Sequence, residues 1–277
     1  MTIAVTGATG HLGGHVLSSL DTRGAAAVAL ARDPSRLPDR DARAFDYDRP
    51  ETLEPALSGI DTLLLISGSE IGKRGPQHRA VIDAARAAGV GHVVYTSVLG
   101  ADASQLFVAP EHRETEAALR ESGLPHTLLR NGWYLENYEG GIEGALATGT
   151  LVGAAGDGRI DAAPRADYAE AAARVLTDPS LQGRTWELAG RPGFTMTELA
   201  RAVSAATGRD IPYRDLSREE YAATLRDAGL PEGLAGALAE TDALTAEGAL
   251  ASGSDDLATL LGRAPTPMQD WVAARLG

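Results

Sequence analysis

The sequence predicts an α/β protein with a doubly wound parallel sheet, followed by a smaller, mainly helical C-terminal lobe. Short apolar runs alternate with helical patterns over the first 130 residues. Each run ends in glycine or in small or polar residues, and a glycine-rich turn separates the first run from the first helical pattern. Because ligands bind outside the carboxyl ends of parallel strands, we expect one cleft along that edge.

The first predicted strand, residues 3–5, leads into a glycine turn and then a helix. Glycines 7, 10 and 13 are followed by apolar residues at helical spacing up to residue 20. A helix that begins at such a turn offers unpaired N–H groups and a positive dipole end to a pyrophosphate. The spacing G-x-x-G-x-x-G departs from the commoner G-x-G-x-x-G fingerprint, but its context is that of a dinucleotide-binding, Rossmann-type fold.

A second strand is predicted over residues 25–31, and Arg32 follows it directly. In a dinucleotide-binding fold this position faces the adenosine ribose, where an arginine pairs with the 2′-phosphate of NADP. Arg36 is close enough in sequence to assist. The alternative is a solvated loop arginine beside Asp33. The first interpretation favours NADP over NAD.

Further strands are expected over residues 42–46, 61–66, 91–96 and 124–129, with helices over 51–57 and 76–88. Asp46, at the end of its strand, is placed to reach the adenine amino group. The small residues Ser67 and Gly68 let the backbone approach a ligand. The sequence therefore predicts a crevice lined at successive strand ends by Gly7–Gly13, Arg32, Asp46, Ser67, Gly68, Thr96, Ser97 and Asn131–Asn137.

Beyond residue 140 the alternation weakens. We expect a helix over 165–177, a strand over 184–188, a helix capped by Thr195 or Thr197, an extended segment over 211–216 and a helix from Ser217. The predicted division is residues 1–140 for the cofactor and 141–277 for a substrate-covering lobe, with later segments able to return to the first unit.

The composition of the chain argues against several classes of function. The 277 residues carry a net charge of −13, which argues against a nucleic-acid partner. The absence of cysteine excludes disulfides and thiolate chemistry. No apolar run is long enough for a membrane helix and no secretory signal is evident, so a cytoplasmic protein is expected. We expect it to be a monomer or a homodimer.

Several kinds of catalytic machinery are missing. The only lysine, Lys73, has Ser69 four residues before it, so no Tyr-x-x-x-Lys pair exists. No H-E-x-x-H or G-x-S-x-G motif occurs, and no metal site is expected. His112 falls near the place of the missing pair. Its residue type suits a proton donor near neutral pH, or else a surface or capping residue.

Long stretches resemble a known family. TGATGHLG at the N-terminus resembles the NmrA-like, atypical short-chain dehydrogenase/reductase group. The segments LLLISGSEIGKRGPQHRAVIDAARAAGV (63–90), VVYTSVLGAD (93–102), TLLRNGWYLENY (127–138) and AAGDGRIDAAPRADYAEAAARVL (154–176) resemble the bacterial type 2 NAD(P)H:quinone oxidoreductases. The related triphenylmethane dye reductases are expected to share the first half and to differ after the fourth strand.

The resemblance implies site residues. NADPH is expected to contact Gly7, Thr9, Gly10, His11, Leu12 and Gly13, with Arg32 on the 2′-phosphate and Ser67, Gly68, Arg74, Thr96 and Ser97 along the cofactor. His11 departs from the glutamine expected there. Asn131, Trp133, Tyr134 and Asn137 are expected near the nicotinamide and the quinone. A purely structural role for Trp133 and Tyr134, closing the core beneath the second lobe, remains the alternative.

The resemblance indicates flavin-independent hydride transfer from NADPH to a quinone. The missing Tyr-Lys pair is consistent with this reaction, because hydride addition yields a phenolate of pKa ~10 that can take its proton from water. Tyr134, Asn131 or Asn137 are candidates for hydrogen bonds to the developing oxyanion, the first two as catalytic residues. The alternatives are an NADP(H)-binding redox sensor without turnover and a reductase of dyes or other conjugated acceptors.

Overall fold

The computed structural model describes all 277 residues and confirms the predicted α/β architecture. Seven parallel strands form one sheet in the order β3-β2-β1-β4-β5-β6-β8. Strand order reverses between β1 and β4, where the binding crevice of such a sheet is expected. The strands are β1 (Ile3–Val5), β2 (Ala27–Ala31), β3 (Ala42–Ala44), β4 (Thr62–Leu65), β5 (His92–Val98), β6 (His126–Asn131) and β8 (Thr185–Leu188).

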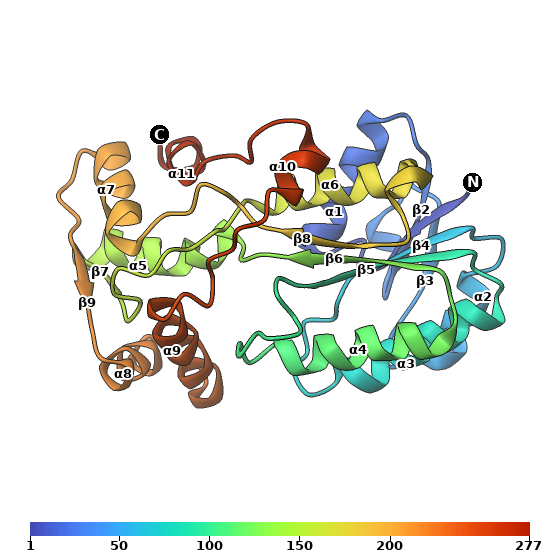
Figure 1. The fold of residues 1–277 in the computed structure, drawn as a ribbon, viewed down its shortest axis with the longest axis horizontal. Coiled ribbons are helices and arrows are strands. Elements are labelled where there is room, and N and C mark those ends of the chain that lie inside the picture. The colour runs from blue at the N-terminus through green and yellow to red at the C-terminus, as the bar shows by residue number, and fades with distance from the viewer.

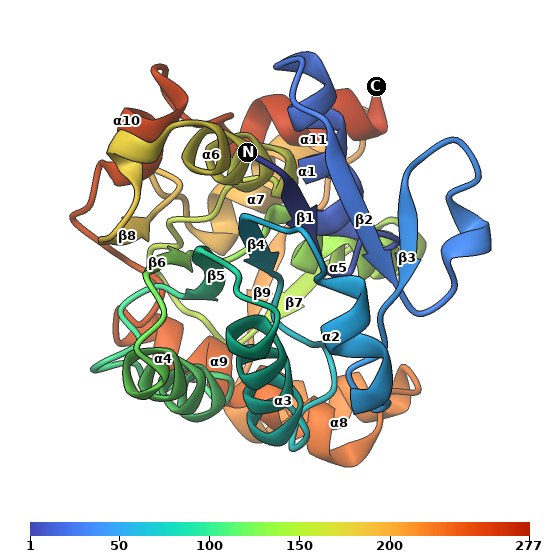
Figure 2. The same cartoon turned by 90° about the vertical axis from the view of Figure 1, so that its right-hand side faces the viewer.

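Helices cover both faces of this sheet (Figures 1 and 2). One face carries α1 (His11–Thr22), α6 (Arg165–Thr177) and α10 (Asp256–Leu261), and the other carries α2 (Leu53–Ala56), α3 (Arg74–Ala87) and α4 (Ala109–Ser122). A separate cluster of buried apolar side chains fills each interface. The strands are therefore buried on both sides, which explains why β4 is a continuous apolar run.

A third cluster of buried apolar side chains forms the core of the second lobe, at the left of Figure 1. This lobe contains α5 (Glu139–Thr148), α7 (Met196–Thr207), α8 (Arg218–Asp227), α9 (Glu232–Ala246) and α11 (Met268–Leu276). It also contains a two-stranded parallel sheet of β7 (Leu151–Gly153) and β9 (Tyr213–Asp215). None of the helices is both long and apolar enough to cross a membrane.

Short 3-10 turns complete the structure, at Pro34–Arg36, Pro50–Thr52, Leu135–Tyr138 and Pro179–Leu181. The helix at 165–177 has the predicted bounds, and Thr195, not Thr197, caps α7. Strand β5 runs to residue 98, so Thr96 and Ser97 lie inside it instead of at its end. Strand β6 is shifted two residues later than predicted.

A charged network ties the carboxyl ends of β5, β6 and β8 together. Arg130 on β6 lies 2.7 Å from the fully buried carboxylate of Glu116 and 2.8 Å from Asp102 and from Glu187. Glu116 Oε1 also accepts a 2.6 Å hydrogen bond from the hydroxyl of Ser97. Glu116 and Arg130 are withdrawn from water, so each of these two charges depends on its partners for solvation, whereas the side chain of Asp102 is exposed.

Replacing Arg130 with methionine should lower the free energy of unfolding by about 3–5 kcal/mol, because the carboxylate of Glu116 then stays buried without its cation. The matched control is Arg120→Met. Arg120 lies 3.5 Å from the same carboxylate but its side chain is 54% exposed, so this change should cost under about 1 kcal/mol. Urea unfolding of both variants measures the difference, and equal losses would contradict the assignment.

Candidate functional site

A cleft of about 750 Å³ runs along the carboxyl ends of the central strands. It is lined by loops at the strand ends and also by Arg165 of α6 and Leu238 of α9. Most of the site residues predicted from the sequence line it. These are Gly7, Thr9, Gly10, His11, Leu12, Gly13, Arg32, Asp46, Ser67, Gly68, Arg74, Ser97, Asn131, Trp133, Tyr134 and Asn137.

The glycine turn leaves the start of α1 open to the cleft. Gly7 adopts a φ of +58°, and the N–H of Gly10 donates to its carbonyl at 2.9 Å. A Cβ at Gly13 would lie 2.2 Å from the carbonyl oxygen of Gly7, so only glycine fits there. No side chain caps α1, and the N–H groups of residues 11–13 have no acceptor within the protein. This arrangement fits an anion such as a pyrophosphate.

Two guanidinium groups stand at the end of β2. Arg32 and Arg36 both line the cleft, and neither forms an ion pair or a side-chain hydrogen bond within the protein. The neighbouring Asp33 accepts from the amide and the hydroxyl of Ser35, at 3.1 and 2.6 Å, and these bonds hold the pKa of its carboxyl below the usual value. Asp33 therefore caps the following turn and leaves Arg32 free for an anionic ligand.

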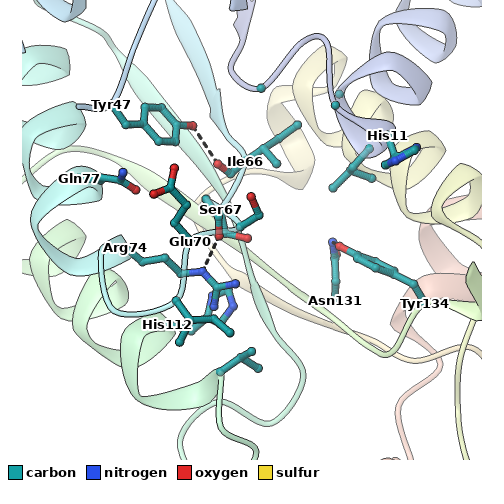
Figure 3. Close-up of a pocket in the computed structure, with 18 of the residues that line it drawn as sticks. His11, Tyr47, Ile66, Ser67, Glu70, Arg74, Gln77, His112, Asn131 and Tyr134 are labelled. Atoms are coloured by element: carbon teal, nitrogen blue, oxygen red, sulfur yellow. Dashed lines mark hydrogen bonds between the residues drawn. The ribbon is translucent and has the colours of Figure 1, made fainter. Parts of the chain in front are cut away.

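The next part of the cleft follows β3. Asp46 lines it, and its Oδ1 accepts the N–H of Asp48 at 3.1 Å. The hydroxyl of Tyr47 lies 2.7 Å from Thr6 Oγ1 and 2.9 Å from the carbonyl of Ile66 (Figure 3). These bonds join the ends of β1 and β4 to the loop after β3, so the wall of the cleft is fixed by groups from three strands.

The loop between β4 and α3 is held from below. The N–H of Ser67 donates to Thr96 Oγ1 at 2.9 Å, and the N–H of Gly68 donates to His78 Nε2 at 3.0 Å. Arg74 Nε donates to the carbonyl of Gly68. Thr96 thus corrects an expectation: it is buried beneath this loop and does not line the cleft, since β5 extends past it. It supports Ser67 instead.

Aromatic and amide groups gather at the end of the cleft nearest the second lobe. Asn131 Nδ2 donates to the hydroxyl oxygen of Tyr134 at 3.1 Å, which leaves the Tyr134 hydroxyl proton without an acceptor in the protein. The Arg165 guanidinium lies 4.7 Å from the centre of the Tyr134 ring and donates to Asn137 Oδ1 at 3.2 Å. Burial raises the pKa of Tyr134, so it is a neutral phenol able to donate.

Trp133 and Tyr134 also pack against the apolar cores, Trp133 against that of the second lobe and Tyr134 against that of the α1 face. Both side chains therefore pack in a core and also line the cleft. Residues that sequence reasoning missed complete the walls, because no local pattern distinguishes them from ordinary core or loop residues. Among them are Phe45, Tyr47, Asp48, Gln77, Phe107, Val108, Arg165 and Leu238.

His112 corrects another expectation. It is neither a surface nor a capping residue: its side chain is buried on α4 and its Nδ1 lies 2.7 Å from the hydroxyl of Tyr95. Burial, and then the positive charge of Arg74, lower the pKa of His112 to about 3. It is therefore neutral near pH 7 and holds no acidic proton to release there.

Known proteins share this fold and sequence. A family model described as NAD(P)H-binding matches residues 7–179. Quinone oxidoreductase 2 of Escherichia coli K12 is 46% identical over 98% of this chain and 97% of its own length. The crystal structure of the NADPH-dependent quinone oxidoreductase QOR2 from E. coli, complexed with NADPH, has a TM-score of 0.95 at 45% identity, covering 99% of this chain and all of that one.

The triphenylmethane reductase of Citrobacter sp. is also similar. Its structure has a TM-score of 0.92 at 35% identity and covers all of this chain and 99% of its own. The likeness to that reductase therefore extends over the whole fold, and the expectation that it ends after the fourth strand is wrong.

Acid should destabilise the protein through His78, which burial and the nearby Arg74 hold at a pKa of about 4. The unfolded chain takes up a proton on this residue near pH 6.5, whereas the folded protein does not until about pH 4. The contribution of neutral His78 is complete above pH 6.5 and falls by about 1.4 kcal/mol per pH unit between 6.5 and 4. His112 contributes over the same pH range, so urea unfolding at several pH values should show the slope of His78 as the difference between the wild type and a variant without this histidine.

The variant His78→Gln should reduce that slope, because glutamine can accept the Gly68 N–H without titrating. His126→Gln is the control, since the His126 ring hydrogen-bonds the Leu124 carbonyl at the amino end of β6, away from the cleft. An unchanged slope in His78→Gln would contradict the assignment.

Proposed function

This chain belongs to the NAD(P)H-binding family that includes quinone oxidoreductase 2 of E. coli, and from that membership we propose that it is an NADPH-dependent quinone oxidoreductase. The observation that carries the proposal is one cleft with two different ends. Unpaired amides and two free guanidinium groups occupy one end, and apolar and aromatic side chains with a few polar groups occupy the other.

The residues present fit the cofactor. The cradle at the start of α1, which a Cβ at Gly13 would fill, suits the pyrophosphate. Arg32, assisted by Arg36, suits the 2′-phosphate, and Asp46 the adenine edge. Thr9, His11, Leu12, Ser67, Gly68, Arg74 and Ser97 are proposed as the remaining cofactor contacts. When bound, NADPH supplies a hydride.

The other end suits a flat, mostly apolar acceptor. Phe107, Val108, Trp133 and Leu238 supply apolar walls, and Asn137 lies at the rim. Reduction of a quinone places negative charge on its oxygen. We infer that Tyr134 donates its free hydroxyl proton as a hydrogen bond to that oxygen, while Asn131 holds the tyrosine oxygen in place.

The proposed reaction uses no flavin. Only the nicotinamide cofactor is needed, because the phenolate that forms has a conjugate-acid pKa of ~10 and takes its proton from water. A colourless purified protein that oxidises NADPH would support this, and one that carries stoichiometric flavin would contradict it.

We also propose which part of the chain binds the cofactor and which covers the substrate. Residues 1–140 hold the cofactor and residues 141–277 cover the substrate, while α6 and β8 return to the main sheet. A monomer or homodimer in the cytoplasm stays a prediction.

A second acceptor class has specific support. The likeness to the Citrobacter triphenylmethane reductase extends over the whole chain, so a conjugated dye is an alternative occupant of the same end of the cleft. The assay is NADPH oxidation followed at 340 nm with benzoquinone, menadione and a cationic triphenylmethane dye. Turnover only with the dye would favour the second class. Tight NADP(H) binding without turnover would indicate a sensor.

Replacing Arg32 with alanine should reduce the preference for NADPH over NADH by about 10- to 100-fold, because a charge-assisted contact to the 2′-phosphate contributes about 1.5–3 kcal/mol. The measurement is kcat/KM for each dinucleotide. Arg23→Ala, an exposed arginine outside the cleft, should leave the ratio unchanged. The assignment fails if the Arg32 variant keeps the wild-type ratio.

Gly13→Ala should abolish NADPH binding or folding of the turn, because its Cβ would lie 2.2 Å from the Gly7 carbonyl oxygen. Gly14→Ala, the next residue on the same helix, meets nothing within 4 Å and should bind NADPH normally. Fluorescence titration with NADPH and thermal melting compare the two variants. Wild-type affinity in Gly13→Ala would refute the proposed cradle.

A further inference from the structure

The imidazole of His112 has one nitrogen bound inside the protein and one directed to the cleft. Nδ1 lies 2.7 Å from the Tyr95 hydroxyl. Nε2 has no partner in the protein, yet it is not among the fully buried atoms that lack one, which are Arg74 Nη1, Glu111 Oε2 and Asn131 Oδ1. Because His112 lines the cleft, its Nε2 is the atom that a bound molecule can reach.

Hydrogen bonds beneath the β4–α3 loop define which nitrogen of each histidine carries the proton. The N–H of Gly68 donates to His78 Nε2, so His78 is protonated on Nδ1 and donates to Thr115 Oγ1 at 2.9 Å. The Thr115 hydroxyl proton is in turn donated to the carbonyl of Glu111 at 2.9 Å. Threonine therefore acts only as an acceptor toward the histidine.

The same reasoning applies to Tyr95. Its hydroxyl is buried, and His112 Nδ1 is its hydrogen-bond partner. Burial raises the pKa of Tyr95, so the group keeps its proton. Thr115 also lies close to the Tyr95 hydroxyl, but His112 Nδ1, at 2.7 Å, is the partner with hydrogen-bonding geometry. A buried O–H without an acceptor is costly, so we infer that Tyr95 donates to Nδ1. The proton of the neutral His112 ring then resides on Nε2, facing the cleft.

The surroundings keep this ring neutral. Arg74 and His78 face it from α3, Tyr95 from β5, and Glu111 precedes it on its own helix. Arg74 is the nearest fixed cation, and its Nη1 has only the carboxylate of Glu111 nearby, at 3.7 Å. A second positive charge on His112 is therefore disfavoured both by burial and by Arg74.

We propose that His112 is a catalytic residue of this reductase, whose Nε2–H donates a hydrogen bond to the quinone oxygen that becomes negative. This inference rests on the proposed function. In Figure 3 His112 and Arg74 lie on one side of the cleft and Asn131 and Tyr134 on the other, so an acceptor between them meets donors from both sides. Transfer of a hydride places two electrons and one hydrogen on the quinone. The resulting anion takes its remaining proton from water, and His112 keeps its own.

Substitution of His112 tests the donor. His112→Leu should lower kcat with benzoquinone by about 10- to 100-fold, somewhat less than the loss of a donor in a fully enclosed oxyanion hole, with little change in the KM for NADPH. His112→Gln should recover most of the rate, because its amide N–H lies near the place of Nε2–H. His126→Leu is the matched control and should keep the wild-type rate.

The pH dependence separates a fixed donor from a proton-releasing acid. The ratio of kcat for wild type to kcat for His112→Leu should stay constant between about pH 5 and 9. An imidazolium acid would instead make this ratio fall about tenfold per pH unit above ~6.5. A falling ratio would overturn the proposal.

Nitrogen-15 NMR of histidine-labelled wild-type protein supplies a readout that needs no turnover. The signal that disappears in His112→Gln should be that of a neutral ring protonated on Nε2 from pH 5 to 9. Tyr95→Phe, which removes the positioning hydroxyl, should mix the two tautomers and lower kcat several-fold without changing the KM for NADPH. A ring protonated on Nδ1, or a positively charged ring, would overturn the proposal.

The outcomes distinguish the two levels of inference. Wild-type protein that oxidises no NADPH with any quinone overturns the proposed function and this inference with it. Active wild type with an equally active His112→Leu variant overturns the inference alone. If His112→Leu does not fold, His112→Gln and the NMR measurement decide the matter, since neither empties the site.

Discussion

The whole cleft depends on backbone amides at the start of α1 that remain without partners. Most buried N–H groups in proteins are paired, so an open set is stable only where water or a ligand can reach it. The turn that creates this opening brings Gly13 against the carbonyl of Gly7, at a distance that admits no side chain. The strand that precedes the turn, β1, is paired on both sides, with β2 and β4, so the turn lies in the interior of the sheet's carboxyl edge.

The arginines near the carboxyl ends of the strands differ in whether they are paired within the protein. Arg130 satisfies three carboxylates and fixes the ends of β5, β6 and β8, whereas Arg32 and Arg36 remain unpaired at the cleft mouth. The paired cation stabilises the fold and the unpaired ones are available to a ligand. Asp33 follows Arg32 directly in the sequence, but its carboxylate is hydrogen-bonded to Ser35 in the turn that it caps.

Burial keeps several titratable side chains around the cleft in their neutral forms, in which they act only through hydrogen bonds. His78 and His112 are held neutral, and the pKa values of Tyr47, Tyr95 and Tyr134 are raised. None of these five groups changes charge near pH 7, so they can orient and stabilise a reacting molecule but are poorly suited to release a proton. That property agrees with an acceptor whose reduced form is a weakly basic phenolate.

The sequence alone determined the sheet, the glycine turn, and the place of Arg32 and most of the strand-end residues along one cleft. It could do so because strand and helix periods and glycine geometry are local properties. It placed Thr96 on the cleft wall and left His112 open between a proton donor and a surface or capping residue, since a strand's last residue and a helix's buried face depend on which neighbours pack there. Tertiary structure alone decided that Arg165 and Leu238, far along the chain, line the cleft, and that the Tyr95 hydroxyl lies against His112. Those relations join elements distant in sequence, and no local pattern records them.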